Sequence, residues 1–158
     1  MTLAIKPAPV KKQVRVAAPQ ATAFRVFTAG FGTWWPASHS IGASPLKEAV
    51  LEGHAGGRWF GRLQDGTEAA WGDVLAWEPP ARVLLAWRIG ADWTYRPDLT
   101  TEVEVTFTPQ GEATLVTLEH RLLENMGPAG QGARARFDSE GGWGALLDLF
   151  AAAAARQA

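Results

Sequence analysis

The sequence predicts an α+β fold in which one long C-terminal helix and two short helices cover a curved antiparallel sheet of seven strands. The strands are indicated by short runs that alternate between apolar and polar residues and are bounded by turn residues. The final helix is indicated by apolar residues that return every three or four positions. With 158 residues, 47% of them hydrophobic and 20% charged, the chain has the composition of one globular core.

The first strand is expected over residues 10–16, after an N-terminal tail of residues 1–9. Apolar residues alternate there with lysine, glutamine and arginine, and the alternation ends before Pro19. Pro19 suits the first turn of a helix, because its missing N–H would have no partner there. Glycines and Pro36 then divide the segment into one helix and a second, shorter helical turn. The apolar residues that return at near-helical spacing in this segment are Ala21, Phe24, Val26, Phe27 and Phe31.

Six further strands follow along the chain. They are separated by turn-forming pairs, of which Asp65-Gly66 and Pro79-Pro80 are the clearest, and consecutive strands joined in this way form an antiparallel meander. We expect the strands at Leu46 to Glu52, Arg58 to Leu63, Glu68 to Glu78, Arg82 to Ile89, Thr101 to Thr108 and Thr114 to Arg121.

The last helix is expected at about Phe137 to Gln157. The segment before it, Met126 to Gly132, holds glycines and a proline and is interpreted as a loop. Its glycine spacing, without a surrounding βαβ unit, excludes a dinucleotide-binding turn. The apolar stripe of the helix comprises Trp143, Leu146, Leu147 and Phe150.

Composition excludes several classes of function. The formal charge of −1, from residues of both signs spread along the chain, gives no footprint for nucleic acid. The absence of cysteine excludes thiol catalysis and disulfides. No window approaches the roughly 20 apolar residues of a membrane span, and no secretory apolar region opens the chain, so we expect a cytoplasmic protein without membrane insertion. The histidines at 39, 54 and 120 lack metal-ligand spacing, so neither metal nor cofactor is expected.

Several short segments carry a resemblance to a known family. They are Gly72 to Leu75 running into Glu78-Pro79-Pro80, Arg82 to Trp87, Leu118 to Arg121, Phe137 to Ser139 and Gly141 to Trp143. Over roughly residues 10–156 the chain resembles bacterial single-domain members of the activator of Hsp90 ATPase homologue 1-like family, in the SRPBCC (START-like, Bet v 1-like) superfamily.

The resemblance implies one domain over residues 10–157 with the helix-grip fold, in which sheet and helix enclose a hydrophobic cavity. Relatives include lipid carriers, plant hormone and allergen proteins, aromatic cyclases and the Hsp90-stimulating domain. The eukaryotic activator also carries an N-terminal Hsp90-binding domain, for which this chain leaves no room before its first strand.

Alternation within the strands identifies the side chains that face this cavity. Val103, Val105 and Phe107 point inward where Glu102 and Glu104 point outward. Each inward residue is also explained as ordinary core, but the eight tryptophans of the chain favour a cavity with aromatic walls. The expected wall comprises Trp35, Trp59, Trp71, Val83, Leu85, Trp87, Val105, Phe107, Leu118, His120, Trp143 and Leu147.

His120 is the titratable residue that alternation sends inward. Beside an aromatic pocket an imidazole can orient a ligand or transfer a proton near neutral pH. The alternative is a core histidine whose hydrogen bonds are satisfied by the backbone. Asp73 and Arg88 are candidate polar neighbours on adjacent strands, although the expected register directs Arg88 to solvent.

Two other features have two interpretations each, and a third has one. The glycines at 141, 142 and 144 either let the last helix approach the sheet at a cavity mouth or form a capping turn with positive φ. Trp34 and Trp35 either form a lid or anchor the short helix. Trp93 and Tyr95, in a loop between strands, are candidates for a homodimer contact.

The leading hypothesis is a non-enzymatic protein that binds a hydrophobic or aromatic small molecule between the sheet and the C-terminal helix. One alternative is an enzyme of the polyketide cyclase or aromatase type, in which His120 shuttles a proton. A second alternative is a module that interacts with a chaperone, as the Hsp90 ATPase activator does.

Overall fold

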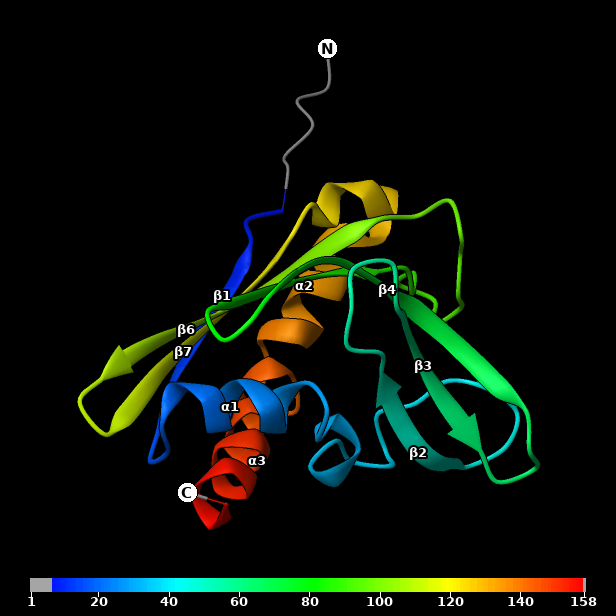
Figure 1. The fold of residues 1–158 in the computed structure, drawn as a ribbon. Helices are drawn as coiled ribbons and strands as arrows, with labels where there is room; N and C mark the ends of the chain where they lie inside the picture. Colours follow the sequence, from blue (N-terminus) through cyan, green and yellow to red (C-terminus); the bar gives the residue numbers. More distant parts are fainter. Residues whose placement is uncertain (1–6, 158) are drawn as a thin grey trace.

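A computed structural model, described here for residues 7–157, contains a seven-stranded antiparallel sheet in the order β1-β7-β6-β5-β4-β3-β2 (Figure 1). The first strand therefore joins the sheet beside the last one, and the remaining strands follow as a meander. The strands are β1 Val10–Val16, β2 Leu46–Leu51, β3 Arg58–Leu63, β4 Glu68–Glu78, β5 Arg82–Trp87, β6 Thr101–Gln110 and β7 Ala113–Arg121.

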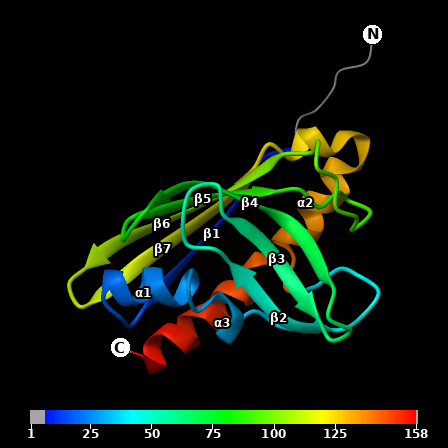
Figure 2. The ribbon, with the colours of Figure 1, turned by 45° about the vertical axis from the view of Figure 1, so that its right-hand side comes forward.

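The helical elements lie on one side of this sheet, and Figure 2 shows the sheet arching over α1 and α3. This arrangement confirms the predicted fold class and its element order up to the end of β7. No helix within residues 7–157 is long and apolar enough to cross a membrane. The helices are α1 Gln20–Phe27, η1 Phe31–Thr33, η2 Leu123–Ala129, α2 Gly130–Asp138 and α3 Trp143–Arg156.

The C-terminal part differs from the prediction. The segment 126–132 is not a loop, because its first residues complete the short helix η2 and Gly130 and Gly132 lie inside α2. The predicted helix from Phe137 is two helices, which are separated by residues 139–142. Packing overrides the weak helix propensity of glycine here, since Gly130 lies against the Leu123 carbonyl where a side chain would not fit.

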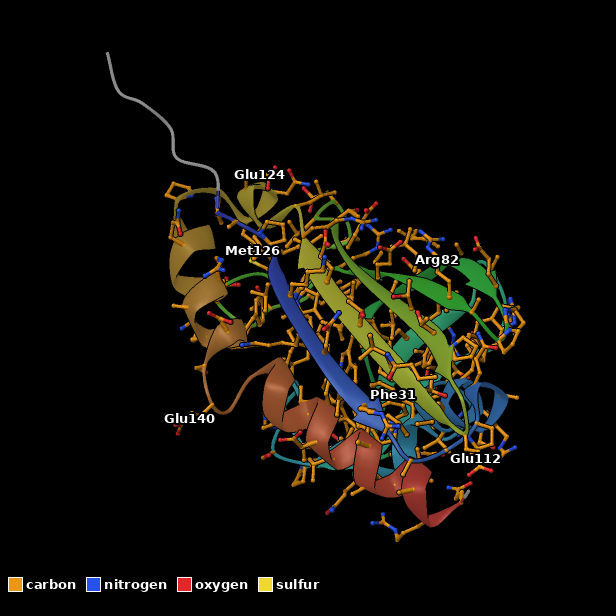
Figure 3. The ribbon with its side chains drawn as sticks, turned by 90° about the vertical axis from the view of Figure 1, so that its left-hand side faces the viewer. Phe31, Arg82, Glu112, Glu124, Met126 and Glu140 are labelled. Carbon is orange, nitrogen blue, oxygen red and sulfur yellow. The ribbon has the colours of Figure 1, made fainter. Side chains whose placement is uncertain are left out.

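The two faces of the sheet differ as the alternation predicts. Val103 and Val105 on β6 are fully buried on the inner face. On the outer face, Glu104 of the same strand accepts hydrogen bonds from Arg82 at 2.6 Å and from Arg121 at 3.1 Å. The bond from Arg82 is the main reason why the pKa of Glu104 lies below its usual value. Figure 3 shows Arg82 on this outer side, with Phe31 between sheet and helices.

Two β-bulges bend β4 and change which of its side chains face inward. Trp71 is the extra residue opposite β3, because Trp59 pairs with Gly72 while Phe60 pairs with Ala70. Leu75 is the extra residue opposite β5, because the partners of Leu85 and Leu84 are two positions apart on β4. A bulge bends its strand and increases the local twist. Trp71 is thereby buried, while Leu75 is left 40% exposed.

Next to the first bulge, β4 and β5 approach so closely that only glycine fits. Gly72 pairs with Trp87, and a Cβ at Gly72 would overlap the carbonyl oxygen of Ala86. The strand β5 then ends at Trp87 rather than at the predicted Ile89. Ile89 instead forms an isolated bridge with Tyr95, so the chain folds back into a loop over residues 89–95.

We predict that Gly72→Ala lowers the free energy of unfolding by about 2 to 3 kcal/mol, because the new methyl group must displace the backbone of β5. Urea denaturation measures the loss. The matched control is Gly132→Ala, where a Cβ meets open space on a helix and alanine stabilises by up to about 1 kcal/mol. A Gly72→Ala protein as stable as the control would contradict the close approach.

Candidate ligand pocket

A pocket of about 470 Å³ lies where the start of α3 meets the first half of β4 and the end of β5. Its floor is formed by four tryptophans, Trp35, Trp71, Trp87 and Trp143. Each exposes no more than 7% of its surface, so the floor lies well inside the protein. These four belong to the twelve wall residues expected from the sequence, and the structure brings them together.

The four indole rings enclose the pocket at different angles. Trp35 lies 5.6 Å from Trp71 and 6.0 Å from Trp143, measured between ring centroids. Trp87 lies 5.8 Å from Trp143, with the rings inclined at 68°. Aromatic rings at these separations attract one another edge to face. The floor is therefore a preformed set of flat apolar surfaces.

Local structure places each of these rings. Trp71 faces inward because of the bulge in β4, and Trp87 is the last residue of β5. Trp143 begins α3. Trp35 follows η1, where its ring stacks on Phe31 at 4.8 Å and its indole N–H donates to the His39 carbonyl at 2.8 Å.

The mouth of the pocket is polar and comes from loops. Ser38, His39 and Ser40 approach from the segment after η1, and Arg136 and Ser139 approach from the end of α2. His39 joins the two sides, because its Nε2 lies 2.9 Å from the Gly141 carbonyl and its Nδ1 lies 2.9 Å from the Ser38 hydroxyl. A carbonyl only accepts, so Nε2 of His39 donates to Gly141.

The other eight expected wall residues lie in the packed core, outside the pocket lining. None of them exposes more than 2% of its surface. Their part in binding a ligand stays a prediction. They are Trp59, Val83, Leu85, Val105, Phe107, Leu118, His120 and Leu147.

His120 is the central member of a hydrogen-bonded chain in this core. The indole N–H of Trp143 donates to Nδ1 of His120 at 3.1 Å. Nε2 of His120 lies 2.8 Å from the hydroxyl of Thr101, which donates in turn to the Trp87 carbonyl at 3.0 Å. The imidazole is therefore neutral, protonated on Nε2, and satisfied at both nitrogens.

Burial lowers the pKa of His120 to about 3, because the charged imidazolium would lose its hydration inside the core. His120 is fully buried and does not line the pocket. The structure thus favours the interpretation of His120 as a core histidine. Its hydrogen-bond partners are the side chains of Trp143 and Thr101, where backbone groups were expected. His120 fixes the orientation of Trp143, a floor residue.

Sequence reasoning missed most of the mouth. Trp93 lines the pocket mouth and is 45% exposed, and its part in a homodimer contact stays a prediction. Ser38, His39, Arg136 and Ser139 lie in loops or at a helix end, where no periodic pattern indicates orientation. The available signal was the cluster of glycines around Trp143, of which Gly141 and Gly142 line the pocket.

Gly142 allows a tight junction between α2 and α3. A Cβ there would overlap the carbonyl oxygen of Phe137. Its φ of −91° shows that the capping turn with positive φ is wrong, and the close approach is to α2 rather than to the sheet. Gly141 and Gly144 have open space around the Cβ position.

Two other sequence interpretations are resolved by contacts. Trp34 anchors the short helix, because its indole N–H donates to the Val26 carbonyl at 3.0 Å, whereas Trp35 lines the pocket. Arg88, the residue after β5, pairs with Asp73 of β4 at 2.7 Å, so the two side chains are neighbours as expected. The expected register directs Arg88 to solvent, but the loop before β6 covers its side chain. Thr100 in that loop accepts a hydrogen bond from Arg88 at 2.6 Å.

Comparison with known proteins identifies the family. A family model described as Activator of Hsp90 ATPase homolog 1-like protein matches residues 17–155. The chain belongs to this family. Its sheet and C-terminal helix have the helix-grip, Bet v 1-like arrangement that the resemblance implies.

Solved structures agree with this assignment. The chain is similar to Txn09, an anthrahydroquino-gamma-pyrone synthase complexed with SUM, with 35% identity, a TM-score of 0.65 and coverage of 93% of this chain and 97% of that one. It is also similar to CalC, a self-sacrificing resistance protein from Micromonospora echinospora, with 30% identity, a TM-score of 0.70 and 96% of each chain covered.

A third solved structure is similar in fold alone. An Hsp90 activator from Plasmodium falciparum is 16% identical, with a TM-score of 0.50 over 72% of this chain and 71% of that one. The sequence matches no curated protein. Within residues 7–157, no group of three or more histidine, aspartate or glutamate side chains is placed to hold a metal ion.

We predict that the buried His120 makes this protein less stable in acid. The unfolded chain binds a proton near pH 6.5, whereas the folded chain binds it only near pH 3. The contribution of His120 to the unfolding free energy is therefore constant above pH 6.5. It falls by roughly 1.4 kcal/mol per pH unit as the pH drops between these two values. His120→Gln keeps a donor and an acceptor but does not titrate, so its urea-unfolding free energy should fall less steeply from pH 6 to 4. Parallel pH profiles would contradict a neutral buried His120.

We also predict that Gly142→Ala loses about 1 to 3 kcal/mol of unfolding free energy and distorts the pocket mouth, because the junction between α2 and α3 must open. Gly144→Ala is the matched control. Its Cβ meets no neighbour on α3, so alanine should stabilise by up to about 1 kcal/mol. Thermal unfolding compares the two variants, and equal melting temperatures would argue against the tight junction.

Proposed function

We propose that this protein binds a planar aromatic small molecule in the pocket lined by Trp35, Trp71, Trp87 and Trp143. The observation that carries the proposal is the pocket of about 470 Å³ with four buried indoles as its floor. Small-molecule sites are typically concave and mostly apolar, with a few polar groups that orient the ligand. The serines, His39 and Arg136 at the mouth supply those polar groups.

The shape of the floor supports a flat ligand. Trp87 and Trp143 are inclined at 68° to one another, and Trp35 is inclined at 62° to Trp143, so flat surfaces border the space from several sides. The hydrogen bond from Trp143 to His120 holds one wall in a fixed rotamer. A preformed wall lowers the conformational entropy that binding would otherwise cost.

The name of one relative supports an aromatic ligand that carries oxygen. Txn09 is described as an anthrahydroquino-gamma-pyrone synthase, whose name denotes fused rings with oxygen substituents. CalC is described as a self-sacrificing resistance protein. Both are at least 30% identical to this chain over more than nine-tenths of its length.

The relation to a synthase favours a second candidate, an enzyme of the cyclase type that reshapes the bound molecule. In that case the proton transfer expected of His120 falls to other groups, because both ring nitrogens of His120 are occupied by hydrogen bonds with Thr101 and Trp143. The chaperone-interacting alternative has support from the description of the family and from the fold shared with an Hsp90 activator.

Native mass spectrometry of the protein purified from its own host is the first experiment. A stoichiometric aromatic passenger would support the proposal and name its ligand class. Incubation with that passenger, followed by chromatography coupled to mass analysis, separates the two candidates: an unchanged compound supports binding, and a new product, isomers included, supports an enzyme.

We predict that Trp35→Leu weakens binding of a neutral planar probe, anthracene-2-carboxamide, by about three- to tenfold, because one wall of the pocket loses its ring. Tryptophan fluorescence quenching or calorimetry measures the dissociation constant. Trp77→Leu is the control, since this half-buried tryptophan packs on Phe24 outside the pocket lining. No binding by the unmodified protein, or equal losses in both variants, would overturn the proposed site.

A further inference from the structure

The pocket lining has an uneven charge. Among its residues are one arginine, Arg136, and one histidine, but no aspartate or glutamate. The floor tryptophans are buried, whereas Arg136 and the serines at 38 and 139 are exposed. The pocket thus has an apolar interior and a mouth that carries a positive charge.

Arg136 forms no ion pair within residues 7–157. One terminal nitrogen of its guanidinium donates to the Ala91 carbonyl at 3.0 Å, and the group lies over the Trp93 ring at 5.5 Å from the centroid. Its Nε and other terminal nitrogen donate to no acceptor in this part of the chain. A guanidinium has five N–H donors, so Arg136 keeps donors for a further partner.

The nearest carboxylates along the chain are engaged or directed elsewhere. Asp92 accepts from Arg96 at 2.6 Å, and Asp138 pairs with Lys12 at 2.7 Å. Figure 3 shows Glu140 on the outside of the turn between α2 and α3, pointing away from the protein. The charge of Arg136 is therefore not neutralised by these neighbours.

We propose that the pocket selects planar aromatic molecules that carry an anionic oxygen substituent, with the rings on the tryptophan floor and the anion at Arg136. This inference rests on the proposed function and specifies its ligand class. The fork of the guanidinium matches the two oxygens of a carboxylate, and charge-assisted hydrogen bonds are roughly twice as strong as neutral ones. Rings and anion cannot exchange places, because a charge among the buried indoles would lose its hydration.

Arg136 has a competing structural role, which the experiment must separate from charge recognition. Its bond to Ala91 and its contact with Trp93 attach the loop over residues 89–95 to α2. If that role alone mattered, replacing Arg136 would weaken charged and neutral ligands equally. If Arg136 recognises the charge of the ligand, replacing it would change the preference for charged over neutral ligands.

The test measures dissociation constants of anthracene-2-carboxylate and its neutral carboxamide for the unmodified protein and for Arg136→Gln. We expect the unmodified protein to prefer the carboxylate by about five- to tenfold at low salt, with the preference falling as salt is added. Arg136→Gln should abolish the preference, and Arg136→Lys should retain part of it. Arg134→Gln is the matched control, because Arg134 lies on the same helix but bonds to the Ala8 carbonyl and Asp138.

The outcomes separate this inference from the proposed function. Equal affinity of the unmodified protein for the two probes would overturn the anion site and leave the aromatic pocket standing. Equal weakening of both probes by Arg136→Gln would likewise overturn it, in favour of the structural role. Binding of neither probe to the unmodified protein would overturn the proposed function itself.

Discussion

The close approach of β4 and β5 at Gly72 is the constraint on which the rest of the structure depends. The absent side chain lets the two strands meet beside a bulge, and that bulge directs Trp71 into the concave side of the sheet. Immediately opposite, Trp87 ends β5 and the chain turns into the loop over residues 89–95. Two of the four floor tryptophans, and the loop that borders the mouth, therefore follow from one backbone contact.

The hydrogen-bonded chain through His120 connects this part of the sheet to the last helix. Trp143 at the start of α3 is joined through His120 and Thr101 to the backbone of Trp87. Each donor in the chain has an acceptor, so the polar groups are buried without loss of their hydrogen bonds. The same contacts that stabilise the helix on the sheet also fix the distance between two walls of the pocket.

Much of the fold could be predicted from local pattern. Alternation correctly placed Val103 and Val105 inside and sent His120 inward, because register in a half-buried sheet is set by its apolar face. Alternation does not show a bulge, so the sequence did not indicate that Leu75 is the extra, exposed residue of β4. It also gives the side on which a residue lies but not its partner, which explains why the bond between His120 and Trp143 could not be foreseen.

The pocket was harder to predict than the sheet. Its floor came partly from counting tryptophans, but its mouth is assembled from three segments far apart in the chain, represented by His39, Trp93 and Arg136. Their mutual position depends on tertiary contacts such as the bond between His39 and the Gly141 carbonyl. Loop segments carry no periodic signal, so sequence alone could not show that they meet.

The clustering of indoles has a spectroscopic consequence. Trp59, Trp71, Trp87, Trp143 and Trp35 form a continuous network with neighbouring centroids 5.5 to 6.0 Å apart. Transition dipoles at such separations couple strongly, and the inclined rings make that coupling chiral. The far-ultraviolet circular dichroism of the protein, at the intense indole transition, should therefore contain an exciton couplet from these tryptophans, and its shape would report any rearrangement there without an added label.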